Sequence, residues 1–164
     1  LLHSLDIAPP PTAPATPDAQ VPLAAPRNDT ARILVAEDNA VNQKIAMRFL
    51  QNHGHQATLV SSGLEALAAL GKHHYDLVFM DVQMPEMDGL EATRTIRRLE
   101  HDKSPGFTHR VCIIAMTANA LAGDREVCLA AGMDDYIVKP LVPDSVHAVL
   151  AKYLRPAPTL SAQA

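Results

Sequence analysis

Five short apolar runs, each followed by an amphipathic stretch, constrain what this chain folds into more than any other feature of its sequence. The runs are 32–36, 57–60, 75–80, 111–116 and 135–138. In the stretches that follow them, leucine, alanine and isoleucine recur at three- and four-residue spacing: 41–53, 63–72, 89–99, 120–131 and 143–153. This repeated alternation indicates a doubly wound parallel sheet, so we predict an α/β fold of five parallel strands with flanking helices.

Three of the runs are predicted to lie in the middle of the sheet. The first, third and fourth are continuously apolar rather than alternating, which is typical of strands covered by helices on both faces. Residues at the borders of the amphipathic stretches agree with helix starts and stops. Ser62 or Gly63, Asp88 and Asp144 stand at the predicted starts, and Gly54 and Gly132 at the predicted stops.

One connection is predicted to be long. The segment from Glu100 to Arg110 contains Pro105 and Gly106 and breaks both the helical and the strand periodicity. We therefore predict a long loop before the fourth strand.

The chain divides into three parts. Residues 31–154 have the length of one domain with its own core. Residues 1–30 contain seven of the thirteen prolines and six alanines, and residues 155–164 are again rich in proline and alanine, so we predict a linker and a flexible tail. The sequence opens with Leu1 rather than methionine, from which we infer a piece of a longer polypeptide with something folded upstream.

Composition and charge exclude several classes of function. A formal net charge of −4 provides no broad basic surface, so we expect no direct contact with nucleic acid. No apolar run approaches the ~20 residues of a membrane-spanning helix, and we expect a cytoplasmic fragment without membrane contact, whose parent chain can be membrane-anchored. Cys112 and Cys128 are predicted to be reduced, packed thiols. The pairs His53/His55 and His73/His74 are predicted to lie at solvent-facing helix ends.

Polar residues follow four of the five apolar runs. Because the carboxyl ends of parallel strands open onto one crevice, we expect these residues to meet there. They are Glu37, Asp38 and Asn39 after the first run, Asp81 after the third, Thr117 after the fourth, and Lys139 with Pro140 after the fifth.

Three clustered carboxylates repel one another unless a cation is bound. A hard divalent ion with oxygen ligands, Mg²⁺ or else Mn²⁺, removes this repulsion and also neutralises charge on a phosphoryl group in transfer. Asp81 is placed to be the nucleophile that forms an acyl phosphate. Lys139 can pair with one phosphoryl oxygen, and Thr117 can donate a hydrogen bond to another.

These motifs together resemble the receiver domains of two-component response regulators. The resemblance covers about three quarters of the chain and implies a flavodoxin-like sheet with strand order 2-1-3-4-5. The matching segments are Glu37-Asp38-Asn39, Met80-Asp81-Val82-Gln83-Met84-Pro85-Glu86-Met87-Asp88-Gly89, Thr117-Ala118 and Lys139-Pro140.

The resemblance also implies a role for each matching residue. Asp81 is similar to the phosphorylated aspartate, Glu37 and Asp38 to the acidic pair around the metal, Thr117 to the switch hydroxyl and Lys139 to the phosphoryl-binding lysine. It further implies that the backbone carbonyl of Gln83 ligates the metal, that Tyr136 is an aromatic switch, and that Gln83 and Asn119 influence loss of the phosphoryl group. It also implies a cis peptide before Pro140. Without the resemblance, Tyr136 would be an ordinary aromatic at the edge of the core.

Within the family, Glu37-Asp38-Asn39 followed by Val41-Asn42-Gln43 resembles receivers joined to a hybrid sensor histidine kinase. This implies a histidine kinase core, expected in the same parent chain, as phosphodonor and a histidine phosphotransfer protein as acceptor. A stand-alone single-domain regulator is the alternative.

Three other functions fit the residues of this sequence less well. A phosphatase with an aspartate nucleophile uses a second acid two residues on, where this chain has Gln83. A flavin-binding electron carrier shares the fold class, but its phosphate loop would not place Glu37 and Asp38 after the first strand. A binding module with vestigial phosphorylation does not need the complete set of site residues found here.

We expect phosphorylation at Asp81 to draw Thr117 and Lys139 inward and to repack the surface formed by 120–153.

Overall fold

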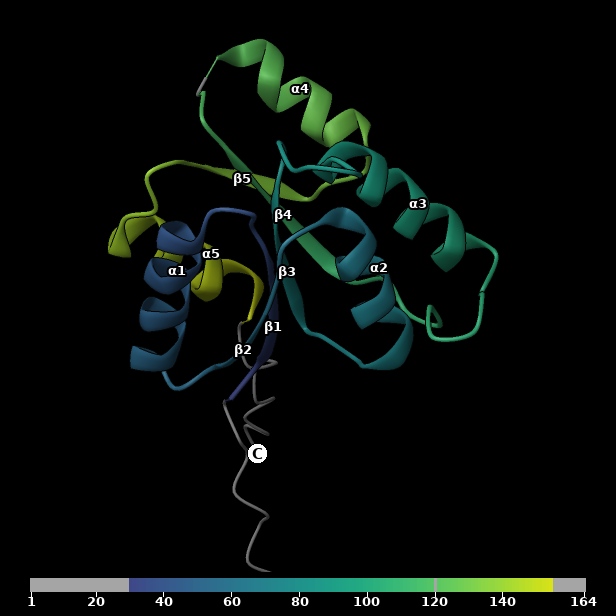
Figure 1. Cartoon of the computed structure of the whole chain (residues 1–164), viewed down its shortest axis with the longest axis horizontal. Helices are drawn as coiled ribbons and strands as arrows, with labels where there is room; N and C mark the ends of the chain where they lie inside the picture. The colour runs from purple at the N-terminus through teal and green to yellow at the C-terminus, as the bar shows by residue number, and fades with distance from the viewer. Residues whose placement is uncertain (1–29, 120, 155–164) are drawn as a thin grey trace, which may run out of the picture.

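The structure, a computed structural model, describes residues 30–119 and 121–154. Within them five parallel strands form one sheet in the order β2-β1-β3-β4-β5, which confirms the predicted fold class and strand order (Figure 1). The elements are β1 (Arg32–Ala36), α1 (Ala40–Asn52), β2 (Gln56–Val60), α2 (Gly63–Lys72), β3 (Leu77–Asp81), α3 (Gly89–His101), β4 (Cys112–Thr117), α4 (Ala122–Ala130), β5 (Asp135–Val138) and α5 (Pro143–Tyr153). The predicted linker and tail, except for Thr30, lie outside the described residues.

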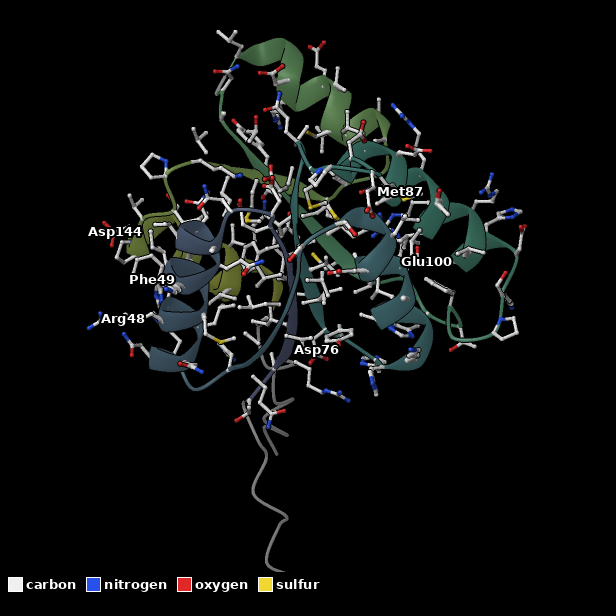
Figure 2. The ribbon with its side chains drawn as sticks, in the orientation of Figure 1. Arg48, Phe49, Asp76, Met87, Glu100 and Asp144 are labelled. Atoms are coloured by element: carbon white, nitrogen blue, oxygen red, sulfur yellow. The ribbon has the colours of Figure 1, made fainter. Side chains whose placement is uncertain are left out.

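Helices cover both faces of the sheet, with α1 and α5 on one side and α2, α3 and α4 on the other (Figure 1). Alternate residues of each central strand therefore enter different apolar clusters. On β1, Ile33 and Val35 pack with α1 and α5, whereas Leu34 and Ala36 pack with α2 and α3. This two-sided burial explains why the first, third and fourth runs are continuously apolar. Arg48 on α1 and Asp144 on α5 point away from the sheet (Figure 2).

The predicted long loop begins two residues later than expected, because α3 continues through Glu100 to His101. The Glu100 carboxylate accepts hydrogen bonds from Arg97 Nη1 at 2.7 Å and from the backbone N–H of Val111 at 2.8 Å. These bonds hold the last turn of α3 against the start of the fourth strand. The prediction of a loop from Glu100 was therefore wrong at its first two residues.

Local capping explains several of the helix ends. Ser62 and Asp88 accept hydrogen bonds from backbone N–H groups in the first turns of α2 and α3, as predicted. Asp144 lies in the first turn of α5. Gly54 and Gly132 follow α1 and α4 with φ of 78° and 104°, the left-handed conformation that a glycine adopts without strain.

The cysteines and histidines agree with their predicted roles with one exception. Cys128 is buried, Cys112 is half-buried, both are free thiols, and burial raises the pKa of Cys112 to about 12. His53 and His73 are exposed helix C-caps. His55 is half-buried instead, because its Nδ1 accepts a hydrogen bond from Ala31 N–H at 3.2 Å. No helix within residues 30–119 and 121–154 has both the length and the apolar character needed to cross a membrane.

Candidate functional site

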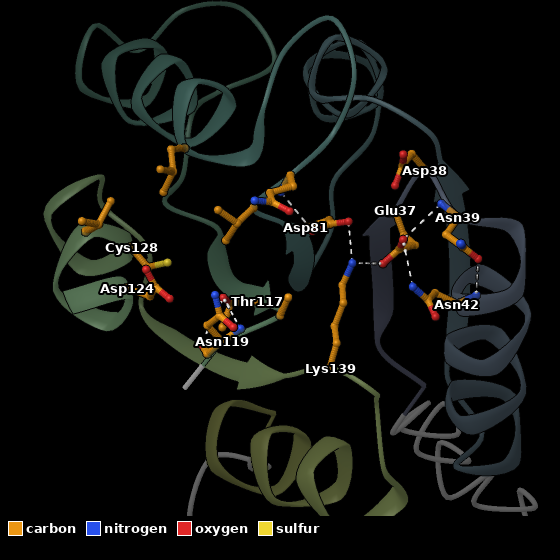
Figure 3. A pocket seen from close by; sticks show the side chains of 15 residues that line it. Glu37, Asp38, Asn39, Asn42, Asp81, Thr117, Asn119, Asp124, Cys128 and Lys139 are labelled. Carbon is orange, nitrogen blue, oxygen red and sulfur yellow. Dashed lines mark hydrogen bonds and ion pairs between the residues drawn. The ribbon is translucent and has the colours of Figure 1, made fainter. Parts of the chain in front are cut away.

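The carboxyl ends of the strands bring all the predicted site residues except Tyr136 to one cleft of about 450 Å³ (Figure 3). Asp81 and Thr117 are the last residues of β3 and β4, while Glu37 and Lys139 directly follow β1 and β5. The cleft is lined by Glu37, Asp38, Asn39, Asn42, Asp81, Val82, Gln83, Leu90, Thr117, Ala118, Asn119, Asp124, Val127, Cys128 and Lys139.

Three carboxylates and one ammonium form the centre of the cleft. Glu37, Asp38 and Asp81 each provide an oxygen, and these oxygens all lie within 4.8 Å of one another. Glu37 is 1% and Asp81 is 3% exposed, whereas Asp38 is exposed. Lys139 Nζ lies 2.7 Å from Glu37 Oε2 and 2.5 Å from Asp81 Oδ2. One cation therefore offsets part of the charge of three acids.

The two partners of the central ion pair respond differently to their surroundings. Burial raises the pKa of Asp81, and the hydrogen bonds from Lys139 and from the backbone N–H of Gln83 only partly oppose this effect. For Lys139 burial alone would lower the pKa, but hydrogen bonds to Asp81 and Glu37 outweigh it and the pKa is raised. The ammonium thus stays charged, and Asp81 is a more basic carboxylate than an exposed aspartate.

The two carboxylate oxygens of Glu37 differ in their hydrogen bonding. Oε1 accepts from Asn39 N–H at 3.1 Å and from Asn42 Nδ2 at 3.2 Å. Oε2 is in ion-pair contact with Lys139 but has no hydrogen bond of good geometry. A buried anionic oxygen in this state is a suitable ligand for a further cation. The all-oxygen donor set and the excess of acid fit a hard divalent ion.

The backbone around Asp81 is packed closely. A Cβ at Gly89 would lie 2.0 Å from the Asp81 carbonyl oxygen, so only glycine fits at the start of α3. The Gln83 N–H donates to Asp81 Oδ1 at 3.0 Å, which fixes the carboxylate on the side away from Lys139. The Lys139–Pro140 peptide is cis, as the resemblance implied.

The two predicted switch residues lie near each other on neighbouring strands. Thr117 is buried at the end of β4, and its Oγ1 exchanges 3.2 Å hydrogen bonds with the backbone of Asn119. Tyr136 on β5 pairs in register with Ala115 of β4 and is partly buried against the apolar cluster on the α2–α3–α4 side. The positions fit the predicted roles, which remain predictions.

Several residues of the cleft were not predicted as site residues. Asn42 belongs to the Val41-Asn42-Gln43 segment singled out in the sequence, but its contact with Glu37 was not predicted. Asp124, Val127 and Cys128 reach the cleft from α4 (Figure 3). Nothing in their local sequence indicates this, because their position depends on how α4 packs.

The chain belongs to the response regulator receiver domain family, whose sequence profile matches residues 33–151. It is 41% identical over 157 residues to probable histidine kinase 1 of Oryza sativa subsp. indica, covering 80% of this chain and 16% of that protein. It is 37% identical over 126 residues to hybrid signal transduction histidine kinase K of Dictyostelium discoideum, covering 74% of this chain and 10% of that protein. The chain therefore spans only a small part of these relatives.

Solved receiver domains share the fold. The receiver domain of a sensor histidine kinase from Pseudomonas aeruginosa PAO1, with a magnesium ion coordinated in its active-site cleft, is 42% identical with a TM-score of 0.66, over 76% of this chain and 98% of that one. The Saccharomyces cerevisiae receiver of Ssk1, crystallised with the histidine phosphotransfer protein Ypd1, is 30% identical with a TM-score of 0.70, over 76% and 88%. The chain thus contains a receiver domain of two-component signalling.

Proposed function

We propose that Asp81 is the phosphoacceptor of this receiver domain and takes its phosphoryl group from a phosphohistidine. The observation that carries the proposal is the position of Asp81, which lies among two other acids and 2.5 Å from Lys139 at the carboxyl end of the sheet. Glu37, Asp38, Asp81 and the backbone carbonyl of Gln83 would hold Mg²⁺ or Mn²⁺. The bound ion would supply positive charge to the phosphoryl oxygens.

The chain's own residues account for the rest of the reaction. An oxygen of Asp81 forms a bond to phosphorus, the bond from phosphorus to the donor imidazole nitrogen breaks, and its electron pair returns to the imidazole. Burial raises the pKa of Asp81, so the bound ion would also help to keep Asp81 in the anionic form that attacks phosphorus. Lys139 then pairs with a phosphoryl oxygen in place of the carboxylate oxygen that it contacts here, so its charge is retained at the site.

Phosphorylation would then be read out through the neighbouring strands. Thr117 has a hydroxyl at the cleft that can turn from Asn119 toward a phosphoryl oxygen, and Tyr136 lies beside β4 where it can follow. Gln83 and Asn119, both exposed at the cleft, would affect how fast water removes the phosphoryl group.

We further propose that the parent protein is a hybrid histidine kinase that relays the phosphoryl group to a histidine phosphotransfer protein. Relatives named as histidine kinases and the likeness to a receiver crystallised with a phosphotransfer protein support this setting. A response regulator without a kinase core is the second candidate, since the transcription factor SKN7 of Saccharomyces cerevisiae is also 38% identical over 123 residues. Transfer of label from this chain to a purified phosphotransfer protein tests the relay.

Labelling with a small phosphodonor tests the acceptor. Incubation with acetyl phosphate and Mg²⁺, followed by intact-mass measurement, should add one phosphoryl group to the wild-type chain and none to Asp81→Asn. Asp144→Asn, an exposed change on α5, should be labelled like the wild type. Undiminished labelling of Asp81→Asn would show that another residue is the acceptor.

A further inference from the structure

The first turn of α1 contacts Glu37 in a way that the reaction described above does not use. Asn42 lies at this end of α1, lines the cleft and donates through Nδ2 to Glu37 Oε1 at 3.2 Å (Figure 3). The backbone N–H of Asn39 donates to the same oxygen at 3.1 Å. Both donors therefore act on one oxygen, and the other oxygen is turned toward Lys139 and the acidic centre.

The main chain of Glu37 is fixed separately from its carboxylate. Gln43 Nε2 donates to the Glu37 carbonyl at 2.6 Å and also contacts Ser61 Oγ at 3.3 Å. The Glu37 N–H donates to the carbonyl of Val60 at 3.0 Å. Loss of the Asn42 amide should therefore leave the loop in place and affect only the rotation of the carboxylate.

We propose that Asn42 is a positioning residue, which holds Oε1 of Glu37 so that Oε2 stays directed at the site shared with Asp38, Asp81 and the divalent ion. This inference deepens the proposed function and rests on its metal site. Without the Asn42 amide, Oε1 keeps only the Asn39 N–H as a donor, so the carboxylate has more orientations to lose when it meets a cation than it has with both donors in place. Asn42 thus acts on the ion through Glu37 rather than as a ligand.

The test compares the affinity for Mg²⁺ or Mn²⁺ of the wild-type chain and Asn42→Leu by isothermal titration calorimetry. Leucine has nearly the same size but no donor. We expect an affinity about tenfold lower, the lower end of what loss of an outer-shell partner causes. Asn52→Leu, the same change at the exposed last residue of α1, should bind like the wild type.

A double-mutant cycle separates positioning from a general disturbance of α1. In the Glu37→Gln background, Asn42→Leu should change the affinity by less than about twofold, because the carboxylate through which it acts is gone. In metal-free buffer the NMR signal of the Glu37 carboxyl carbon should shift in Asn42→Leu but not in Asn52→Leu. These readouts do not depend on phosphoryl transfer.

Wild-type affinity in Asn42→Leu, or an equal loss in the Glu37→Gln background, would overturn the positioning role and leave the proposed phosphoacceptor untouched. A wild-type chain that binds the ion but is not labelled at Asp81 would overturn the proposed reaction alone. A wild-type chain that binds no divalent ion would overturn both.

Discussion

Asp81 combines near-complete burial with a site crowded by like charge. Its raised pKa, caused first by burial, means that the metal-free folded chain holds a proton on Asp81 more tightly than the unfolded chain does. Between the ordinary value of 3.8 and the raised folded value, the folded state binds more protons, so this group's contribution to stability falls as pH rises. At neutral pH the charged form destabilises the metal-free fold.

Removal of this charge should therefore stabilise the metal-free protein. In chelator at pH 7, we expect Asp81→Asn to increase the free energy of unfolding, because it removes a buried charge that the metal-free fold disfavours. The difference should shrink as the pH falls toward 4, because wild-type Asp81 then becomes neutral. Urea denaturation at several pH values measures it, with Glu126→Gln, an exposed change in the middle of α4, as the unaffected control. If Asp81→Asn were less stable than the wild type in chelator, the account would be wrong. In excess Mg²⁺ the wild type should become the more stable of the two, because only the wild type binds the ion well.

The position of some site residues could be predicted from the sequence, and that of others could not. Glu37, Asp81, Thr117 and Lys139 could be assigned to one crevice, because the ends of parallel strands fix their position whatever the details of packing. The contact between Asn42 and Glu37 could not, since it depends on the direction in which α1 leaves the loop and on one rotamer. Asp124 reaches the cleft only through the packing of α4.

At the scale of elements, glycine at the start of α3 sets how closely that helix approaches β3. Gly89→Ala should lower the free energy of unfolding by about 2 kcal/mol or more, because its Cβ would lie 2.0 Å from the Asp81 carbonyl oxygen and backbone must move. The same shift should weaken binding of Mg²⁺. Urea denaturation and calorimetry measure the two effects.

Gly123 in the first turn of α4 provides the matched control. A Cβ there has nothing within 4 Å, so Gly123→Ala should stabilise the chain by about 0.5 to 1 kcal/mol. Equal stability changes in the two variants would show that helix propensity, rather than the approach of α3 to Asp81, governs Gly89.

Element boundaries were predicted less well than element types, for physical reasons. Periodicity identified all five helices found within the described residues, but α3 ends two residues later than predicted because the Glu100 carboxylate accepts a hydrogen bond from the backbone N–H of Val111, just before β4. Tyr75, predicted as the first residue of the third strand, is buried but precedes β3. Its apolar character reflects packing rather than pairing, and sequence alone does not separate the two.

At the scale of the whole molecule, Arg97 joins three elements near the amino ends of β4 and β5, at the end of the sheet opposite the cleft. From α3 it donates to the carbonyls of Gly132 and Val111 at 2.8 and 2.9 Å, and to Asp134 at 3.0 Å before β5. It also pairs with Glu100 on its own helix. This half-buried guanidinium links the far ends of α3, β4 and β5 without touching the acidic centre.

Arg97→Met should therefore separate stability from function. We expect a loss of about 2 to 3 kcal/mol in the free energy of unfolding, because the change removes the hydrogen bonds of Arg97 to two carbonyls and two carboxylates. Asp134 keeps its ion pair with Arg110, and Glu100 keeps the hydrogen bond from the Val111 N–H. Affinity for Mg²⁺ should stay at the wild-type value. The neighbouring, exposed Arg98→Met should alter stability by less than about 0.5 kcal/mol. If urea denaturation gave the two variants the same midpoint, the network would have no stabilising role.

The first and last described residues, before β1 and after α5, both lie at this same end of the sheet, opposite the cleft. Ala31 and Leu154 both pack against the apolar cluster beneath α1 and α5, and α5 runs back from the carboxyl end of β5 (Figure 1). A module tethered at either point must reach Asp81 past the length of a five-residue strand, roughly 17 Å. Tether length would then set the local concentration of a donor at the cleft, and a tether too short for that span would favour transfer between molecules over transfer within one.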